Sequence, residues 1–268
     1  MADILYRMTL VLYFFGTVLF LIYLLRRTET VSRTASFVTG TGFLAHTAAL
    51  IGRIVGLGSF PLLTFQDAVS LFAWLLLLVM FGAILFKSLH VLGAFILPLA
   101  FLALVSAIVT PVEQPNLPPV FHAVWIHVTL SVLGTVGFAV AFVAGIMYLI
   151  QDRLLKSKRF NVLYFKLPPL DFLDMLNHRS ILLGFPFLTL GILTGALSAQ
   201  MTSGSYLSWN SEQIWALITW IFYFVVLLGR VTAGWRAKKA ALLTIVGFAG
   251  VVLTFVGVLL KNPGSLSQ

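Results

Sequence analysis

Residues 124–150 read VWIHVTLSVLGTVGFAVAFVAGIMYLI and contain no aspartate, glutamate, lysine or arginine. A helix of that length crosses a hydrocarbon core about 30 Å thick. Arg153, Lys156, Lys158 and Arg159 follow directly, and basic residues beside an apolar span mark its cytoplasmic end. This stretch therefore predicts a transmembrane helix that ends in the cytoplasm.

The rest of the chain repeats this pattern. Its 268 residues are 60% hydrophobic and 9% charged, and its mean hydropathy is +1.05, which is far more apolar than a water-soluble domain. We therefore expect an all-α, polytopic transmembrane helix bundle of about eight spans, embedded in the lipid bilayer as a single domain over residues 1–268. The apolar windows are residues 5–25, 37–57, 67–86, 91–110, 124–150, 180–200, 213–229 and 240–260.

The charges of the loops predict how the bundle is oriented. Lysine or arginine follows the first, third, fifth and seventh windows, whereas the loops near residues 58–66, 111–123 and 201–212 contain neither. Basic loops stay on the cytoplasmic side of a membrane. Both termini are therefore expected on the outer, periplasmic side of a bacterial cytoplasmic (inner) membrane.

Charge and cysteine content exclude several classes of protein. The net charge is +9, but the basic residues flank apolar segments and form no stripe of the kind that binds nucleic acid, so we expect no nucleic-acid partner. The chain has no cysteine. This excludes structural disulfides, cysteine-ligated zinc, iron–sulfur clusters and covalent haem attachment through a Cys-x-x-Cys-His motif. Any cofactor must be held non-covalently.

The longest connection, residues 152–177, contains a proline pair. Leu167, Pro168 and Pro169 precede the segment LDFLDML at 170–176. Proline interrupts a helix, and the mixture of leucine and aspartate after it is typical of a short amphipathic helix at the membrane interface. We therefore expect such a helix over 170–176.

The fifth window also carries three glycines, Gly134, Gly137 and Gly145. Small residues allow the backbones of two membrane helices to approach closely. These glycines indicate a possible contact face, although glycine is common in membrane helices generally.

Two histidines at membrane depth are candidate ligands. His46 lies near the middle of the second window; it is either a neutral imidazole that hydrogen-bonds a neighbouring helix, or a ligand of haem or a metal. His127 lies about one turn inside the outer end of the fifth window, and His122 lies just outside it. These two are about 140° apart around a helix, so they form no metal-binding pair. For His90 and His178, at cytoplasmic helix ends, we expect no ligand role.

Arg53 and the tryptophans are the other candidates for binding. Arg53 lies near an outer helix end and has two possible partners, a propionate or phosphate of a ligand, or Asp67 at the start of the next window. Trp209 lies in the outer loop, and Trp215 and Trp220 follow it in the next window. They form either a platform for a flat apolar ligand or an ordinary interfacial aromatic belt. No nucleotide-binding loop, zinc-protease motif or nucleophile triad is present, so hydrolytic chemistry has no support.

Three stretches resemble the cytochrome c assembly membrane family that includes CcsA, ResC and the HemX-like proteins. They occur in the family's order and extend over most of the chain. The first is WIHV at 125–128. The second is NHRSILLGFP at 177–186 with LTLGILTGA at 188–196. The third runs from GSY at 204–206 through WALITW at 215–220 to GWR at 234–236 and GF at 247–248. A weaker match consists of Arg53 with GSFPL at 58–62.

The resemblance implies haem handling within the membrane. In this family a tryptophan-rich outer loop presents haem and flanking histidines coordinate its iron. By position, His127 matches the outward histidine before that loop, and Arg53 matches a basic residue at the start of the first outer loop. We therefore expect non-covalent haem b. Its iron ligands would be His127 and His46, and the residues around it Arg53, Trp125, Trp209 and Trp215.

The departures from the family pattern refine this expectation. The loop motif Trp-x-Trp-Asp-Pro-Lys-Glu is replaced by LSWNSEQ at 207–213, Leu228 stands in place of an intramembrane histidine, and residues 261–268 lack the second outward histidine. These losses favour the HemX-like branch, which is linked with control of haem biosynthesis. The expected function is therefore non-enzymatic.

Two functions remain open on this basis. The first is haem binding in regulation of haem biosynthesis or in support of cytochrome c maturation, with glutamyl-tRNA reductase or a cytochrome c maturation protein as partner. The alternative is a component of a cytochrome c haem-export or synthase system that acts with a periplasmic partner.

Overall fold

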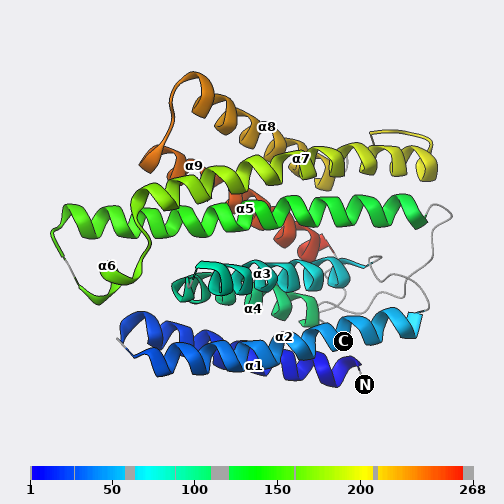
Figure 1. The fold of residues 1–268 in the computed structure, drawn as a ribbon. Helices are drawn as coiled ribbons and strands as arrows, with labels where there is room; N and C mark the ends of the chain where they lie inside the picture. Colours follow the sequence, from blue (N-terminus) through cyan, green and yellow to red (C-terminus); the bar gives the residue numbers. More distant parts are fainter. Residues whose placement is uncertain are drawn as a thin grey trace. The chain divides into compact units, whose positions relative to one another are not determined.

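All regular elements that the computed structural model describes are helices (Figure 1). The described residues are 2–26, 28–57, 64–87, 89–109, 121–159, 161–207 and 211–261. The all-α prediction is therefore confirmed. The helices are α1 Ala2–Leu25, α2 Glu29–Leu57, α3 Phe65–Lys87, the 3-10 turn η1 His90–Leu92, α4 Gly93–Val109, α5 Phe121–Lys156, α6 Val162–Lys166, α7 Leu170–Ser203, α8 Ser211–Thr232 and α9 Ala237–Lys261.

The described helices include seven that are long and apolar enough to cross a membrane. The chain is therefore a multi-pass membrane protein. The eighth expected window, 240–260, lies within α9, but the side chains after residue 253 are outside the described part, so this span stays a prediction, as does the orientation of the termini. The seven spans are Ile4–Leu25, Glu29–Val55, Phe65–Lys87, His90–Ala107, Val124–Lys156, Leu170–Met201 and Gln213–Thr232.

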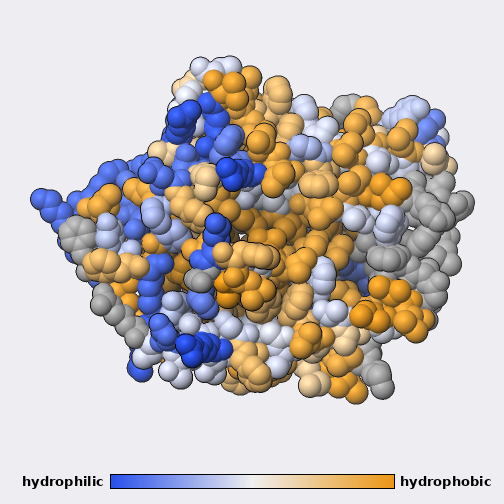
Figure 2. Space-filling view, viewed as in Figure 1, coloured by the Kyte–Doolittle hydropathy of each residue, from blue (hydrophilic) through white to orange (hydrophobic). Residues whose placement is uncertain are grey.

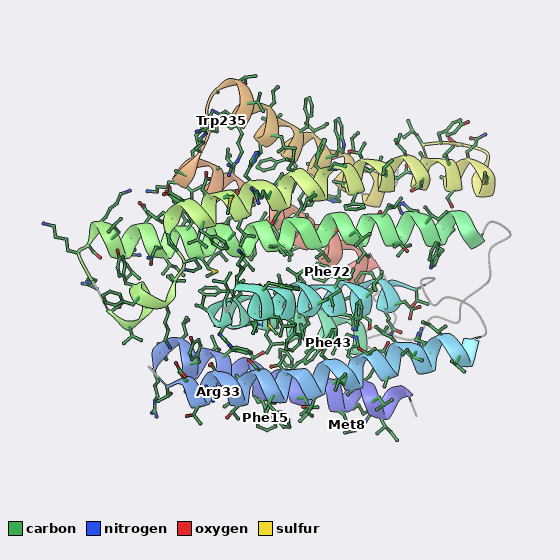
Figure 3. The ribbon with its side chains drawn as sticks, in the orientation of Figure 1. Met8, Phe15, Arg33, Phe43, Phe72 and Trp235 are labelled. Carbon is green, nitrogen blue, oxygen red and sulfur yellow. The ribbon has the colours of Figure 1, made fainter. Side chains whose placement is uncertain are left out.

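Large apolar side chains on the helix flanks fit a lipid environment. On α1, Met8 is 51% exposed and Phe15 is 53% exposed, and both point outward from the helix (Figure 3). Hydrophilic residues instead gather around the C-terminal end of α5 and around α6 (Figure 2), where Arg153 and Lys156 are exposed. In water such apolar flanks would be unfavourable, but a bilayer solvates them.

Contacts divide the chain into two compact units. The first unit comprises Met1–Val109 and Leu154–Pro168, and the second comprises Thr110–Arg153 and Pro169–Gln268. Each unit is described below by itself, and the single domain over residues 1–268 stays a prediction.

The first unit is built around the packing of α1 on α2. Gly42 of α2 lies under the ring of Tyr13, because a Cβ at Gly42 would be 3.0 Å from that ring. Lys166 of α6 donates hydrogen bonds to the carbonyl oxygens of Tyr23 and Arg26 at the C-terminal end of α1. A cation at this position satisfies carbonyls that the helix itself leaves unpaired and favours the negative end of its dipole.

In the second unit, glycines bring the backbones of α5 and α7 into contact. A Cβ at Gly134 would lie 2.8 Å from the backbone nitrogen of Leu188, and a Cβ at Gly137 would lie 2.8 Å from the Cα of Gly184. Figure 1 shows the two helices side by side. Gly145 makes a similar approach to α9, because a Cβ at this position would lie 3.1 Å from the carbonyl oxygen of Ala241. The close contact expected from these three glycines is therefore confirmed.

The separate amphipathic helix expected over 170–176 is wrong. Residues 170–176 form the first two turns of α7, and Pro169 is the N-cap of that helix. A proline at a helix start is compatible with helix geometry, because the first N–H groups have no partner within the helix. Leu173 is fully buried, whereas Asp171 and Met175 are exposed, so one face of this first part of α7 packs in the second unit.

Candidate functional site

His127 of α5 donates a short hydrogen bond to the backbone of α7. Its Nδ1 lies 2.6 Å from the carbonyl oxygen of Gly191. A carbonyl oxygen only accepts, so Nδ1 must carry the proton and donate it. The hydroxyl of Ser131 is 3.5 Å from the same nitrogen and competes weakly. None of the described hydrogen bonds involves Nε2, whose lone pair is thus available to a ligand.

Glycines in α7 make room for this histidine. A Cβ at Gly195 would lie 2.7 Å from Cε1 and Nδ1 of the His127 ring, and a Cβ at Gly191 would lie 2.6 Å from the Ser131 hydroxyl oxygen. The two glycines are four residues apart, so they share one face of α7. That face receives the N-terminal part of α5.

The tryptophans expected around haem are only partly described. Trp125 is half-buried on α5, and its position two residues before His127 places it about 200° around the helix from the histidine. Trp215 of α8 is 37% exposed, which is compatible with lipid contact and with a ligand platform. Trp209 lies outside the described residues, and so does the side chain of His122.

Trp220 of α8 packs against α7. Its indole N–H donates a hydrogen bond of 2.9 Å to the Thr189 hydroxyl on α7. Its ring stacks on Phe224, with 5.4 Å between the centroids, and also packs on Phe185. This tryptophan therefore joins α8 to α7.

His46 has partners on both ring nitrogens. It is fully buried in the first unit, where Nδ1 is 3.1 Å from the Tyr13 hydroxyl and Nε2 is 2.9 Å from the Ser70 hydroxyl. Ser70 is in turn 3.3 Å from the Tyr6 hydroxyl. These contacts correspond to the first of the two roles considered from the sequence, an imidazole that hydrogen-bonds neighbouring helices. To bind iron, His46 would have to give up Tyr13 or Ser70.

Arg53 forms an ion pair with Asp67. Its Nε lies 2.5 Å from one carboxylate oxygen, and the two side chains are 22% and 4% exposed. The other carboxylate oxygen of Asp67 accepts a hydrogen bond of 2.6 Å from the Thr64 hydroxyl. Of the two partners considered for Arg53, the structure contains the aspartate.

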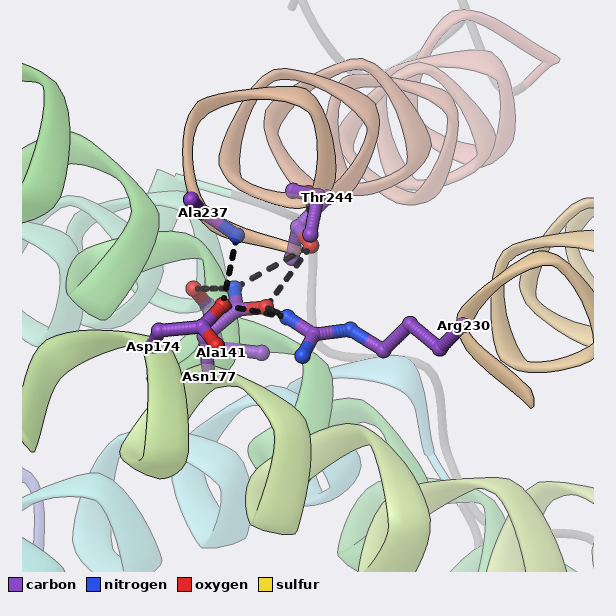
Figure 4. Close-up of polar contacts among 7 residues, drawn as sticks. Ala141, Asp174, Asn177, Arg230, Ala237 and Thr244 are labelled. Atoms are coloured by element: carbon purple, nitrogen blue, oxygen red, sulfur yellow. Dashed lines mark hydrogen bonds and ion pairs between the residues drawn. The ribbon is translucent and has the colours of Figure 1, made fainter. Parts of the chain in front are cut away.

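A buried polar cluster in the second unit was not recognised in the sequence (Figure 4). The Arg230 side chain is 5% exposed. Its Nη2 donates to Asp174 at 3.0 Å and to the amide oxygen of Asn177 at 2.7 Å. The Asn177 amide nitrogen donates to the carbonyl of Ala141 and to the Thr244 hydroxyl. This Arg230 cluster joins α5, α7, α8 and α9.

Sequence reasoning treated Arg230 only as a basic residue that marks a cytoplasmic loop. An arginine at the end of a span usually extends toward water, so its position alone gives no reason to expect burial. The available signal was the spacing of Asp174 and Asn177, which are three residues apart and therefore share one face of a helix.

Comparisons with known proteins agree with this architecture. The family described as "Cytochrome C assembly protein" matches residues 62–265. The cytochrome c biogenesis protein CcsA of Chlorella vulgaris is 32% identical over 261 residues, which cover 84% of this chain and 82% of that protein. CcsA of Chlamydomonas reinhardtii is 33% identical, with 77% and 60% covered, and CcsA of Prochlorococcus marinus is 30% identical, with 78% and 74% covered.

A solved structure shares the fold. The cytochrome c haem lyase CcmF superposes with a TM-score of 0.66 at 17% identity, and the superposition covers 98% of this chain and 49% of CcmF. At this identity the likeness concerns the fold alone. The family match and the CcsA relatives establish the narrower point that this chain belongs to the cytochrome c assembly protein family.

Proposed function

We propose that this protein is a CcsA-like component of cytochrome c biogenesis that holds haem b at the outer end of α5, with His127 as an iron ligand. The observation that carries the proposal is the hydrogen bond of 2.6 Å from His127 Nδ1 to the Gly191 carbonyl. Histidines that bind metals typically donate their other ring N–H to a carbonyl or carboxylate, which fixes the tautomer and the ring orientation.

The donors present fit a haem. Haem iron already has the porphyrin nitrogens as ligands, so one or two protein side chains complete its coordination. His127 offers a neutral imidazole nitrogen, and the aromatic side chains of α8 provide apolar surface beside α7. His127 is the better ligand of the two candidates, because both nitrogens of His46 already have partners.

The chain would hold haem as a cargo for another protein. It contains no cysteine, so it cannot attach haem to itself through thioether bonds. Haem handed to an apocytochrome must remain non-covalently bound until transfer. We therefore propose a periplasmic cytochrome c maturation protein as partner, acting on the outer side where the loop charges place the His127 end of α5.

The reported relatives favour the second of the two functions considered from the sequence. All three are named for cytochrome c biogenesis, whereas regulation of haem biosynthesis through glutamyl-tRNA reductase has no corresponding observation. The relatives come from Prochlorococcus and from algae. For this chain we propose a bacterial cytoplasmic membrane, with both termini outside.

A gene deletion tests this function. The deletion strain is complemented with wild type, with His127→Ala or with His90→Ala, and covalently bound haem is measured on denaturing gels. We expect c-type cytochromes to disappear in the deletion strain, to return with wild type and with His90→Ala, and to remain at least about ten-fold reduced with His127→Ala. Normal c-type cytochromes in the deletion strain would contradict the proposed function.

A further inference from the structure

The face of α7 that carries Gly191 and Gly195 lies directly against the ring of His127. A Cβ at Gly195 would lie 2.7 Å from both Cε1 and Nδ1 of that ring. Real Cβ contacts are essentially never this short, so an added methyl group would displace the imidazole. Position 195 must therefore be glycine for the His127 ring to keep its place, because any side chain there would collide with the ring.

The displaced atom is also the hydrogen-bond donor. Nδ1 lies 2.6 Å from the Gly191 carbonyl, and this carbonyl is one turn before Gly195 on the same face of α7. The Thr194 hydroxyl also donates to it, at 3.0 Å. A ring pushed away by a methyl group at 195 would lose or lengthen its bond to Gly191, while the backbone of α7 could stay in place.

This hydrogen bond has a chemical consequence for a bound metal. Donation from Nδ1 increases the basicity of Nε2. A more basic axial imidazole favours ferric over ferrous haem, and axial ligation is one of the properties through which a protein sets the reduction potential of haem. The contact thus affects both the direction of the Nε2 lone pair and its strength as a donor.

We infer that Gly191 and Gly195 are positioning residues for His127, through which α7 aims Nε2 at the haem iron and sets its donor strength. Gly191 acts through its carbonyl, and Gly195 acts by leaving space for the ring. This inference rests on the proposed function, because it requires His127 to be an iron ligand.

The test uses Gly195→Ala in the purified full-length protein loaded with haem b. We expect haem occupancy, measured as Soret absorbance per protein, to fall about ten-fold or more, and the reduction potential of the remaining haem to rise. Gly145→Ala is the matched control. A Cβ at Gly145 would also be in tight contact, 3.1 Å from the Ala241 carbonyl oxygen. Position 145 lies about 27 Å along α5 from His127, so occupancy and potential should stay as in wild type.

A double-variant experiment separates positioning of the ring from general packing. In His127→Gly, free imidazole should restore haem binding, and adding Gly195→Ala should change this restored binding by less than about two-fold, because the tethered ring is gone. An equal loss of haem in Gly195→Ala with and without His127 would overturn the inference, and so would an equal loss in Gly145→Ala.

The outcomes distinguish the inference from the proposed function. If His127→Ala keeps the wild-type haem spectrum, the proposed function fails and the inference fails with it. If His127→Ala loses haem while Gly195→Ala keeps wild-type occupancy and potential, the inference alone is overturned.

Discussion

At the scale of single residues, the two membrane histidines differ in their partners. Both stand in apolar spans, and the sequence left a ligand role open for each. In the structure His46 bonds Tyr13 and Ser70 through its two nitrogens, whereas His127 donates from Nδ1 to Gly191. This difference depends on residues 24 to 64 positions away, so no local pattern could have shown it.

The structure predicts a stabilising role for His46. His46→Leu removes both hydrogen bonds and leaves the Tyr13 and Ser70 hydroxyls in an apolar interior. We expect a loss of about 1–3 kcal/mol in stability, measured by thermal unfolding in detergent, and a smaller loss for His46→Gln, which keeps a donor and an acceptor. Unfolding of His46→Leu at the wild-type temperature would show that these bonds contribute nothing.

At the scale of helices, sequence patterns identified the contact face of α5 but not the helix that it meets. Gly134 and Gly137 were correctly seen as a face for close approach, and α7 is the partner. The start of α7 was missed, because Pro168 and Pro169 look like an interruption when they in fact precede the first turn. Proline can interrupt a helix or stand at its start, so the residue alone does not show that the helix continues unbroken from Leu170 to Ser203.

The α5–α7 contact predicts a position-dependent effect of alanine. In Gly137→Ala the new Cβ would meet the Gly184 backbone at 2.8 Å, and we expect a destabilisation of about 1–3 kcal/mol. Gly82→Ala on α3 has open space around it and should be neutral or slightly stabilising. Equal unfolding temperatures for the two variants in detergent would contradict this account of the contact.

The Arg230 cluster predicts that the four helices of the second unit depend on one guanidinium. Arg230→Met removes the guanidinium that donates to the Asp174 carboxylate and to the Asn177 amide oxygen, and it leaves the carboxylate with the Ala237 N–H but without its cation. Removing one partner of a fully buried ion pair costs about 3 kcal/mol. The Asp174 side chain is 25% exposed, so we expect a smaller loss, seen as a lower unfolding temperature. Arg236→Ala, at an exposed position, is the control and should unfold like wild type.

At the scale of the whole molecule, composition and spacing were sufficient for the fold class. Seven of the expected windows correspond to described spans, because the requirement to pair every backbone group in lipid leaves few alternatives to a helix. Less of the candidate site could be predicted from the sequence. Trp209 lies outside the described residues. Arg53 pairs with Asp67, which is one of the two partners considered from the sequence. The choice between haem regulation and cytochrome c biogenesis came from the relatives, since both functions can use the same haem ligand.

The optical spectrum of the purified full-length protein, oxidised and then reduced with dithionite, tests the central claim most directly. After addition of haem b, we predict a Soret band and reduced α and β bands in wild type and in His90→Ala, and an occupancy at least about ten-fold lower in His127→Ala. A wild-type protein without Soret absorbance, or a His127→Ala protein with the wild-type spectrum, would contradict the assignment of His127 as the haem ligand.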